Sequence, residues 1–178
     1  MLIQKNSLVK KSSKKHWLLT GAFLLLIILG SKIDLDFGGI VLFTLQTLFL
    51  GLAYYYLPLP NRVTLISLYL LLGIVGLPVF NGGIGSEYVL SYPLGFFVGF
   101  VVSAFVPVNK SENFSQSLLY FMVVHVVILS LGVLWLLQYD SLLVAAETAK
   151  SLSIGMVVKS LTATIVVVLV SKTKNTLD

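Results

Sequence analysis

Long stretches without a charged residue constrain this chain more than any other feature. No Asp, Glu, Lys or Arg occurs between Asp36 and Arg62, or between Glu112 and Asp140. Charged residues make up 11% of the chain and hydrophobic residues 57%, whereas a soluble domain has about 25% charged residues. Such a chain lacks the polar surface needed to face water on all sides. The sequence therefore predicts an integral protein of the cell membrane.

Apolar stretches that could form spanning helices recur along the chain. A transmembrane helix needs about 20 predominantly apolar residues, and a chain of 178 residues is about the length of one domain. We expect an all-α bundle of six transmembrane helices that forms a single membrane domain over residues 1–178. The predicted helices cover about 17–30, 40–57, 63–77, 92–106, 117–137 and 151–170.

The basic residues predict how the bundle is oriented, because Lys and Arg are enriched at the cytoplasmic ends of spanning helices. A basic segment, residues 1–15, precedes the first helix, and we expect both termini in the cytoplasm. The net charge of +5 is then a topology signal, and we expect no nucleic acid as a partner. The residues assigned to the cytoplasmic side are Lys5, Lys10, Lys11, Lys14, Lys15, Arg62, Lys110, Lys172 and Lys174. Those assigned to the outer side are Asp34, Asp36, Glu87, Asp140 and Glu147.

The first apolar segment has a second interpretation. The lysines from Lys10 to Lys15, followed by an apolar run, resemble the first two regions of a signal peptide. No clear cleavage site of the small-x-small type precedes Asp34. We therefore expect this segment to be retained as a helix.

The sequence offers little for catalysis. It contains no cysteine, so it can form no disulfide, thiolate nucleophile or cysteine-ligated metal site. It also lacks the nucleophile elbow, the His-Glu-x-x-His motif and the phosphate-binding loop. No cluster of Asp or His is present that could hold a catalytic metal. We expect no enzyme activity, no metal and no cofactor.

Lys159 is the most informative single residue because it lies inside a predicted spanning helix. A charged side chain there is costly unless it faces a polar cavity, a partner or a ligand. Two interpretations remain: it binds an anionic group, or it reaches the membrane interface from a tilted helix. Its position well inside residues 151–170 favours binding.

Two uncharged polar residues also lie inside predicted helices. His125 is flanked by valines, and no acidic residue in any predicted span could complete a proton relay with it. A hydrogen bond from His125 to another helix is therefore the favoured interpretation. Gln46 either joins helices or donates into a pocket, and its spacing does not separate the two.

The predicted outer connections, 31–39, 78–91 and 138–150, are longer than the cytoplasmic ones. The second contains the run Asn81-Gly82-Gly83-Ile84-Gly85, and glycine permits backbone conformations that other residues avoid. These loops either cover a pocket that opens outward or are plain connections.

Three stretches in order resemble one known family. They are Phe43-Thr44-Leu45-Gln46-Thr47, then Gly76-Leu77-Pro78-Val79-Phe80 leading into Asn81-Gly82-Gly83, and Tyr92-Pro93-Leu94-Gly95-Phe96-Phe97-Val98-Gly99-Phe100. In this order and spacing they resemble the BioY family, the biotin-binding S-components of energy-coupling factor (ECF) transporters. The resemblance covers about Ile40 to Ser160.

The resemblance implies a six-helix membrane subunit whose vitamin pocket faces the outside. It implies two kinds of partner besides the lipid bilayer. One is a small-molecule vitamin, lipoate or biotin, and the other is an ECF module of one transmembrane coupling protein and two ATPases. ATP hydrolysis would then occur on those separate subunits, which agrees with the missing phosphate-binding loop. A membrane assembly subunit that binds no small molecule is the alternative from a different class.

Two departures from the family bear on the ligand. Biotin-binding members resemble one another in a Pro-Gly-Asp-x-x-Lys stretch, where this chain keeps Lys159 but has Met156 in place of the acid. Some members carry asparagine where this chain has Ile84. Burying the N–H donors of biotin's ureido ring without acceptors costs about 1–3 kcal/mol each. These changes favour lipoate, whose dithiolane ring is apolar and suits a Met sulfur, with biotin as the alternative.

The predicted binding residues follow from this resemblance. Lys159 would attract the carboxylate or another polar group of the vitamin, and an apolar and aromatic wall would hold its ring. If the ligand is biotin, Gln46 and Asn81 are candidate acceptors for the ureido ring. Tyr88 and Tyr92 also fit an aromatic belt at the membrane interface. The predicted wall residues are Met156, Ile84, Phe80, Tyr88 and Tyr92.

Overall fold

The computed structural model describes residues 2–35, 43–110 and 113–177, with side chains described over 13–33, 44–110 and 113–173. Nearly all of these residues are helical, which confirms the predicted all-α class. The two-residue strands β1 (Asp34–Leu35) and β2 (Phe43–Thr44) form one short antiparallel pair. The helices are α1 (Leu2–Lys32), α2 (Gln46–Tyr56), α3 (Leu59–Ile74), α4 (Gly85–Leu90), α5 (Leu94–Ser103), α6 (Phe114–Leu136) and α7 (Leu142–Leu177).

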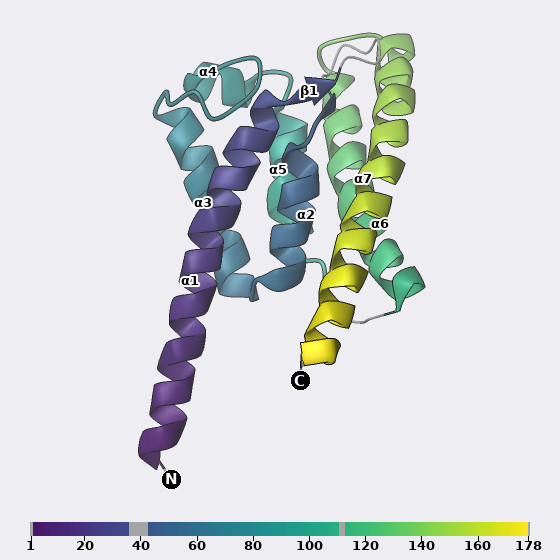
Figure 1. The fold of residues 1–178 in the computed structure, drawn as a ribbon. Helices are drawn as coiled ribbons and strands as arrows, with labels where there is room; N and C mark the ends of the chain where they lie inside the picture. Colours follow the sequence, from purple (N-terminus) through teal and green to yellow (C-terminus); the bar gives the residue numbers. More distant parts are fainter. Residues whose placement is uncertain (1, 36–42, 111–112, 178) are drawn as a thin grey trace.

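Apart from the short α4, the helices run lengthwise through the bundle, and successive helices run in opposite directions (Figure 1). β1, α4 and the connection between α6 and α7 lie at one end, here called the α4 end. The start of α1 and the end of α7 lie at the other, the terminal end. α6 packs against α5 and α7, α1 packs against α2 and α3, and α2 also contacts α7. The start of α1 and the end of α7 thus lie at the same end of the bundle, as an even number of lengthwise helices requires.

Three described helices are long and apolar enough to cross a membrane. They comprise Ser13–Lys32, Phe114–Leu136 and Leu142–Thr173. Leu59–Ile74 and Leu94–Ser103 are shorter apolar helices. The six-span count and the cytoplasmic position of both termini stay predictions.

The observed helices differ from the predicted ranges mainly at their ends. α1 begins within the predicted basic segment 1–15, and α7 begins at Leu142, so most of the predicted connection 138–150 is helical. α3 begins at Leu59, four residues before the predicted start at 63, because Pro60 is tolerated in the first helical turn, where an N–H has no partner within the helix. α4 was not predicted. α2 begins at Gln46, and residues 40–42 of the predicted second helix lie outside the described residues.

Glycines allow α5 and α6 to approach closely. A Cβ atom added at Gly99 on α5 would lie 2.8 Å from Ile128 Cα on α6. One added at Gly95 would lie 2.4 Å from the carbonyl oxygen of Leu131. Small residues at a helix crossing let two backbones pack directly, as is common in membrane bundles. This contact fixes α5, which carries much of the wall of the cavity described below.

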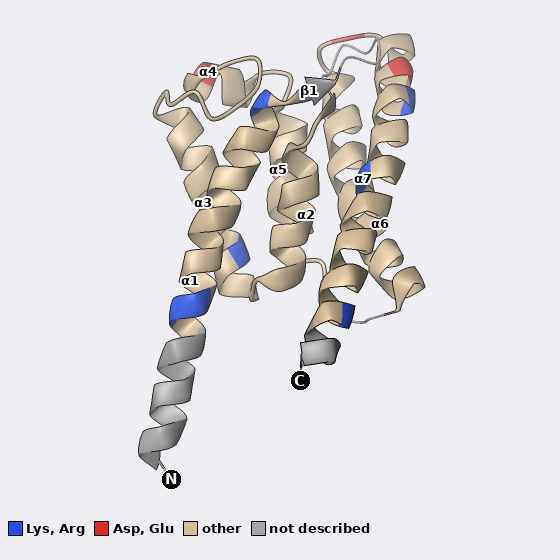
Figure 2. Cartoon of the chain, viewed as in Figure 1, with Lys and Arg blue, Asp and Glu red and all other residues tan. Residues whose placement is uncertain are grey.

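Charged residues are unevenly distributed between the two ends. Within the described chain, the acidic residues lie at the α4 end (Figure 2). Those with described side chains are Glu87 in α4, Asp140 in the connection after α6, and Glu147 near the start of α7, and the backbone of Asp34 lies in β1 at the same end. Basic residues occur at both ends, and Lys159 lies midway along α7. The acidic residues thus mark the end that the sequence analysis assigned to the outside.

Candidate functional site

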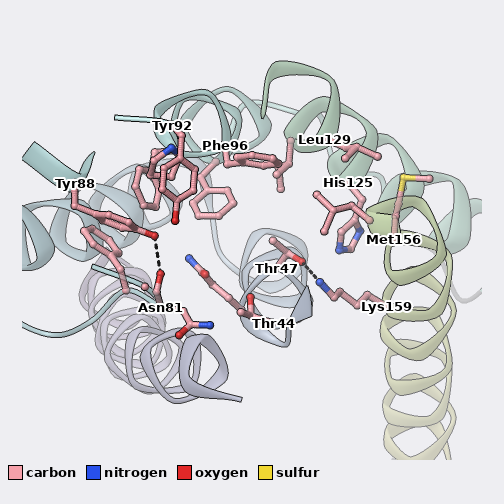
Figure 3. Close-up of a pocket in the computed structure, with 18 residues that line it drawn as sticks. Thr44, Thr47, Asn81, Tyr88, Tyr92, Phe96, His125, Leu129, Met156 and Lys159 are labelled. Atoms are coloured by element: carbon pink, nitrogen blue, oxygen red, sulfur yellow. Dashed lines mark hydrogen bonds between the residues drawn. The ribbon is translucent and has the colours of Figure 1, made fainter. Parts of the chain in front are cut away.

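A cavity of about 170 Å³ lies inside the bundle among α2, α4, α5, α6 and α7. It exceeds the cavity of about 150 Å³ that holds benzene in another protein, so it has room for the ring system of a small ligand. Figure 3 shows the side chains that surround it. Its lining residues are Thr44, Gln46, Thr47, Phe80, Asn81, Gly82, Tyr88, Tyr92, Pro93, Phe96, Phe97, Phe100, His125, Ile128, Leu129, Leu152, Met156 and Lys159.

One wall of this cavity is aromatic. The ring centroids of Phe80 and Phe97 lie 4.7 Å apart, and those of Tyr88 and Tyr92 lie 5.9 Å apart in an edge-to-face arrangement. Such contacts stabilise aromatic clusters beyond the area that they bury. The tyrosine pair comes from α4 and the residues that follow it, so this wall joins the loops of the α4 end to α5 (Figure 3).

Tyr88 also fixes the glycine-rich connection. Its hydroxyl donates a 2.6 Å hydrogen bond to the backbone carbonyl of Asn81. Burial, together with the neighbouring Tyr92 hydroxyl, raises the pKa of the Tyr88 phenol, which therefore stays protonated and able to donate. Gly82 next to Asn81 has a φ of +94°, a conformation that side chains disfavour. The wall and the loop thus form one unit.

Gln46 joins two helices, one of the two roles that its sequence position left open, and it also lines the cavity. Its Nε2 donates a 2.9 Å hydrogen bond to the Tyr69 hydroxyl on α3, which in turn donates to the Val79 carbonyl at 3.0 Å. Gln46 therefore joins α2 to α3 while it lines the cavity. Ser31 Oγ on α1 donates to the same Val79 carbonyl at 2.7 Å, so this carbonyl is held from two helices.

Lys159 points into the bundle and lines the cavity. Its side chain is only 7% exposed, and its Nζ donates a 3.0 Å hydrogen bond to Thr47 Oγ1 on α2. An ammonium at this depth is compatible with a membrane helix when it meets polar partners or a ligand. The cavity therefore has a cationic side formed by α2 and α7, opposite the aromatic wall (Figure 3).

His125 lies beside this cationic side, with its ring buried in the bundle. Its Nδ1 lies 2.9 Å from the backbone carbonyl of Phe121 and 3.1 Å from Ser160 Oγ on α7. The favoured interpretation of the sequence, contact with another helix, agrees with the second of these distances. Its Nε2 is buried and has no hydrogen-bond partner among the described residues.

The structure brings together all of the predicted binding residues except one. Ile84 directly precedes α4, is 56% exposed and does not line the cavity. The sequence analysis did not select Thr47 or the α5 phenylalanines for the site, although all of them lie within the stretches that carried the family resemblance. Leu152 and Leu129 had no signal in the sequence that could have identified them.

Comparison with known proteins gives consistent relatives. The sequence pattern of the BioY family matches residues 5–177. The chain is 34% identical over 141 residues to the biotin transporter BioY of Thermotoga maritima, which covers 77% of this chain and 80% of that protein. It is 38% identical over 104 residues to the biotin transporter BioY2 of Lactococcus lactis, covering 55% of this chain and 57% of that protein.

A solved structure shares the fold. The crystal structure of the S-component for biotin from an ECF-type ABC transporter aligns with a TM-score of 0.78. The alignment covers 91% of this chain and 93% of that one at 18% sequence identity. At this identity the likeness concerns the arrangement of the helices.

Proposed function

The chain belongs to the BioY family, and from this premise we propose that it is the substrate-binding subunit of an ECF-type importer and that its ligand is biotin. It is a multi-pass membrane protein, as predicted. Two of its relatives are named as biotin transporters. The observation that carries the proposal is the buried cavity, because a membrane bundle without a ligand has little reason to bury a lysine beside an apolar space.

The two sides of the cavity suit the chemistry of biotin. Biotin combines an apolar thioether ring with a cyclic urea and a carboxylate. Its ring would pack against the aromatic wall of Phe80, Phe97 and Tyr88, and Lys159 would donate to an oxygen atom of the ligand. Pockets of this kind are mostly apolar, with a few polar groups that fix the orientation of the ligand.

The sequence-based preference for lipoate is not supported. This preference was based on two apolar residues, Met156 and Ile84, at positions where biotin-binding family members carry polar residues. Ile84 is exposed and lies off the cavity, so its side chain carries no information about the ligand there. Met156 does line the cavity, yet the named relatives are biotin transporters. Biotin, the alternative ligand, fits these observations better.

Membership of a family of transport subunits also confirms that the chain is not an enzyme. In the proposed function it works with a transmembrane coupling protein and two ATPases, which supply the energy for transport. The number of partner subunits belongs to this proposal.

The proposal is tested with the full-length protein purified in detergent. Small molecules released by denaturation are identified by mass spectrometry, and the ligand-free protein is then titrated with biotin and with lipoate. A ligand that binds the folded state stabilises it by about 2.7 kcal/mol at a hundredfold excess over Kd, so biotin should raise the unfolding temperature. Binding of lipoate alone would overturn the choice of ligand. Binding of neither vitamin would favour the membrane assembly subunit.

A further inference from the structure

His125, which lines the cavity, has a polar ring atom that has no role in the proposed function. His125 Nε2 is buried and has no hydrogen-bond partner among the described residues, and the side chain is 4% exposed. His125 lines the same cavity as Lys159 and Met156 (Figure 3). A buried polar atom without a partner costs about 1–3 kcal/mol, so this position calls for an explanation.

The surroundings of the ring determine what Nε2 can do. Nδ1 lies 2.9 Å from the Phe121 carbonyl oxygen, and a carbonyl oxygen only accepts hydrogen bonds. Donation from Nδ1 satisfies this carbonyl, and Ser160 Oγ, 3.1 Å from Nδ1, can accept from the same N–H group. In this tautomer Nδ1 carries the ring proton. In the neutral imidazole the other nitrogen then has a free lone pair. A second positive charge next to Lys159 in an apolar bundle is unfavourable, so the neutral form holds and Nε2 is an acceptor.

The protein side chains near His125 do not satisfy this acceptor. Leu129, Ile128 and Met156 also line the cavity, and their side chains have no N–H or O–H group to offer. Lys159 directs a hydrogen bond to Thr47 on α2. A donor for Nε2 is thus expected from the molecule that occupies the cavity.

We infer that His125 Nε2 accepts a hydrogen bond from a ring N–H of the bound vitamin, while Lys159 donates to the adjacent carbonyl oxygen. A cyclic urea presents this pair of groups side by side on one edge. His125 and Lys159 lie on the same side of the cavity (Figure 3), so an acceptor and a donor face that edge together. The inference rests on the proposed function and makes His125 a specificity-determining residue for it.

The inference also explains how this chain could bind a ureido ligand although Met156 stands where biotin-binding family members have an acidic residue. The thioether of Met156 on α7 is at best a weak acceptor. His125 on the neighbouring helix α6 supplies a full acceptor to the same cavity. A dithiolane ring has no N–H group and would leave Nε2 without a partner, so His125 discriminates against lipoate.

The test compares two variants with two kinds of ligand in the full-length, detergent-purified protein. His125→Leu removes the acceptor, and His125→Gln restores an amide oxygen at a similar reach. The ligands are biotin and biotin derivatives methylated at one or the other ureido nitrogen. His16→Leu is the matched control, because His16 is the only other histidine and does not line the cavity. Calorimetry gives the affinities, and thermal unfolding without ligand gives the stability of each variant.

We expect His125→Leu to weaken biotin binding about tenfold, the loss of one hydrogen bond, and His125→Gln to recover part of it. Methylation of the nitrogen that faces Nε2 should weaken binding to the unchanged protein but make little further difference in His125→Leu. If His125 were purely structural, its replacement would instead lower the unfolding temperature and leave the affinity unchanged. That result would overturn the inference.

Failure of the inference and of the proposed function are distinguishable. If the unchanged protein binds no biotin, the proposed function fails and the inference fails with it. If it binds biotin and tolerates methylation at both ureido nitrogens, the inference alone fails. This last comparison needs no variant, so it decides the matter even where His125→Leu does not fold.

Discussion

Lys159 Nζ donates a 3.0 Å hydrogen bond to Thr47 Oγ1, which joins α7 to α2 across 112 positions of the sequence. Both residues line the cavity. A charge is costly inside a membrane helix, and this contact orients the ammonium toward the space that a ligand would fill. The same group therefore contributes to the packing of the bundle and to the cationic side of the cavity.

Lys159→Met should weaken biotin binding about ten- to hundredfold. The substitution keeps the length of the side chain but removes a charged donor, and such a hydrogen bond contributes about 1.5–3 kcal/mol. Titration calorimetry on the purified protein measures the change. Lys150→Met is the matched control, since Lys150 lies on the same helix but is exposed and off the cavity. Equal affinities for the two variants would remove Lys159 from the binding site.

Gly99→Ala should destabilise the bundle by about 1–3 kcal/mol, the usual cost of adding a methyl group to a closely packed contact. The new Cβ would lie 2.8 Å from Ile128 Cα and 3.1 Å from its carbonyl oxygen, and backbone atoms cannot rotate away. Thermal unfolding in detergent measures the loss. Gly21→Ala on α1 serves as the control, because a Cβ there would meet no atom within 4 Å. A similar loss for both variants would contradict the close approach of α5 and α6.

Arg62→Met should lower the free energy of unfolding by about 3 kcal/mol. The buried guanidinium donates to the carbonyls of Leu57, Ala104 and Val106 at 2.9–3.1 Å. These groups lie just past the ends of α2 and α5, where carbonyls lack partners within the helix and the helix dipole is negative. Removal of the guanidinium takes away the hydrogen bonds that these three carbonyls receive from Arg62, two of which are fully buried. Denaturant unfolding in mixed micelles checks the value.

A second variant and the ligand affinity distinguish a structural role of Arg62 from a role in ligand binding. Arg62→Lys keeps the charge but lacks the planar fork of donors, so its stability should fall between those of the unchanged protein and Arg62→Met. None of these residues lines the cavity, so the affinity for biotin should change little in either variant. A large loss of affinity without a loss of stability would assign Arg62 to the ligand site instead.

The fold class could be predicted from the sequence because only helices and closed barrels span membranes, and continuous apolar runs approaching 20 residues are typical of spanning helices. The helix ends could not. α7 begins at Leu142 and continues through Glu147 and Lys150, since backbone hydrogen bonds within a helix do not depend on the membrane that surrounds part of it. α4 has six residues, too few for a periodic pattern to reveal.

The site could be predicted only in part, because few of its residues differ in chemical character from the residues that face lipid. Lys159 was identifiable because a lysine in a spanning helix is costly. Phe96 and Phe100 were not, because nearly every face of these helices is apolar and sequence periodicity does not distinguish cavity from lipid. Ile84 shows the opposite error, since a match to a motif did not place its side chain in the cavity. The acceptor on His125 depends on which nitrogen faces the Phe121 carbonyl, and the sequence does not determine this.

The predicted orientation can be tested with single cysteines, because the chain has none of its own. Asp140 and Asn109 are both exposed and lie at opposite ends of α6, and replacing either leaves the Lys and Arg residues that set the topology unchanged. In intact cells Asp140→Cys should react with a membrane-impermeant maleimide, whereas Asn109→Cys should react only after the membrane is permeabilised. The reverse result would place both termini outside and the α4 end, with its cavity, in the cytoplasm. An importer could not then capture its vitamin from outside through this cavity, so the outcome bears on the proposed function as well as on the topology.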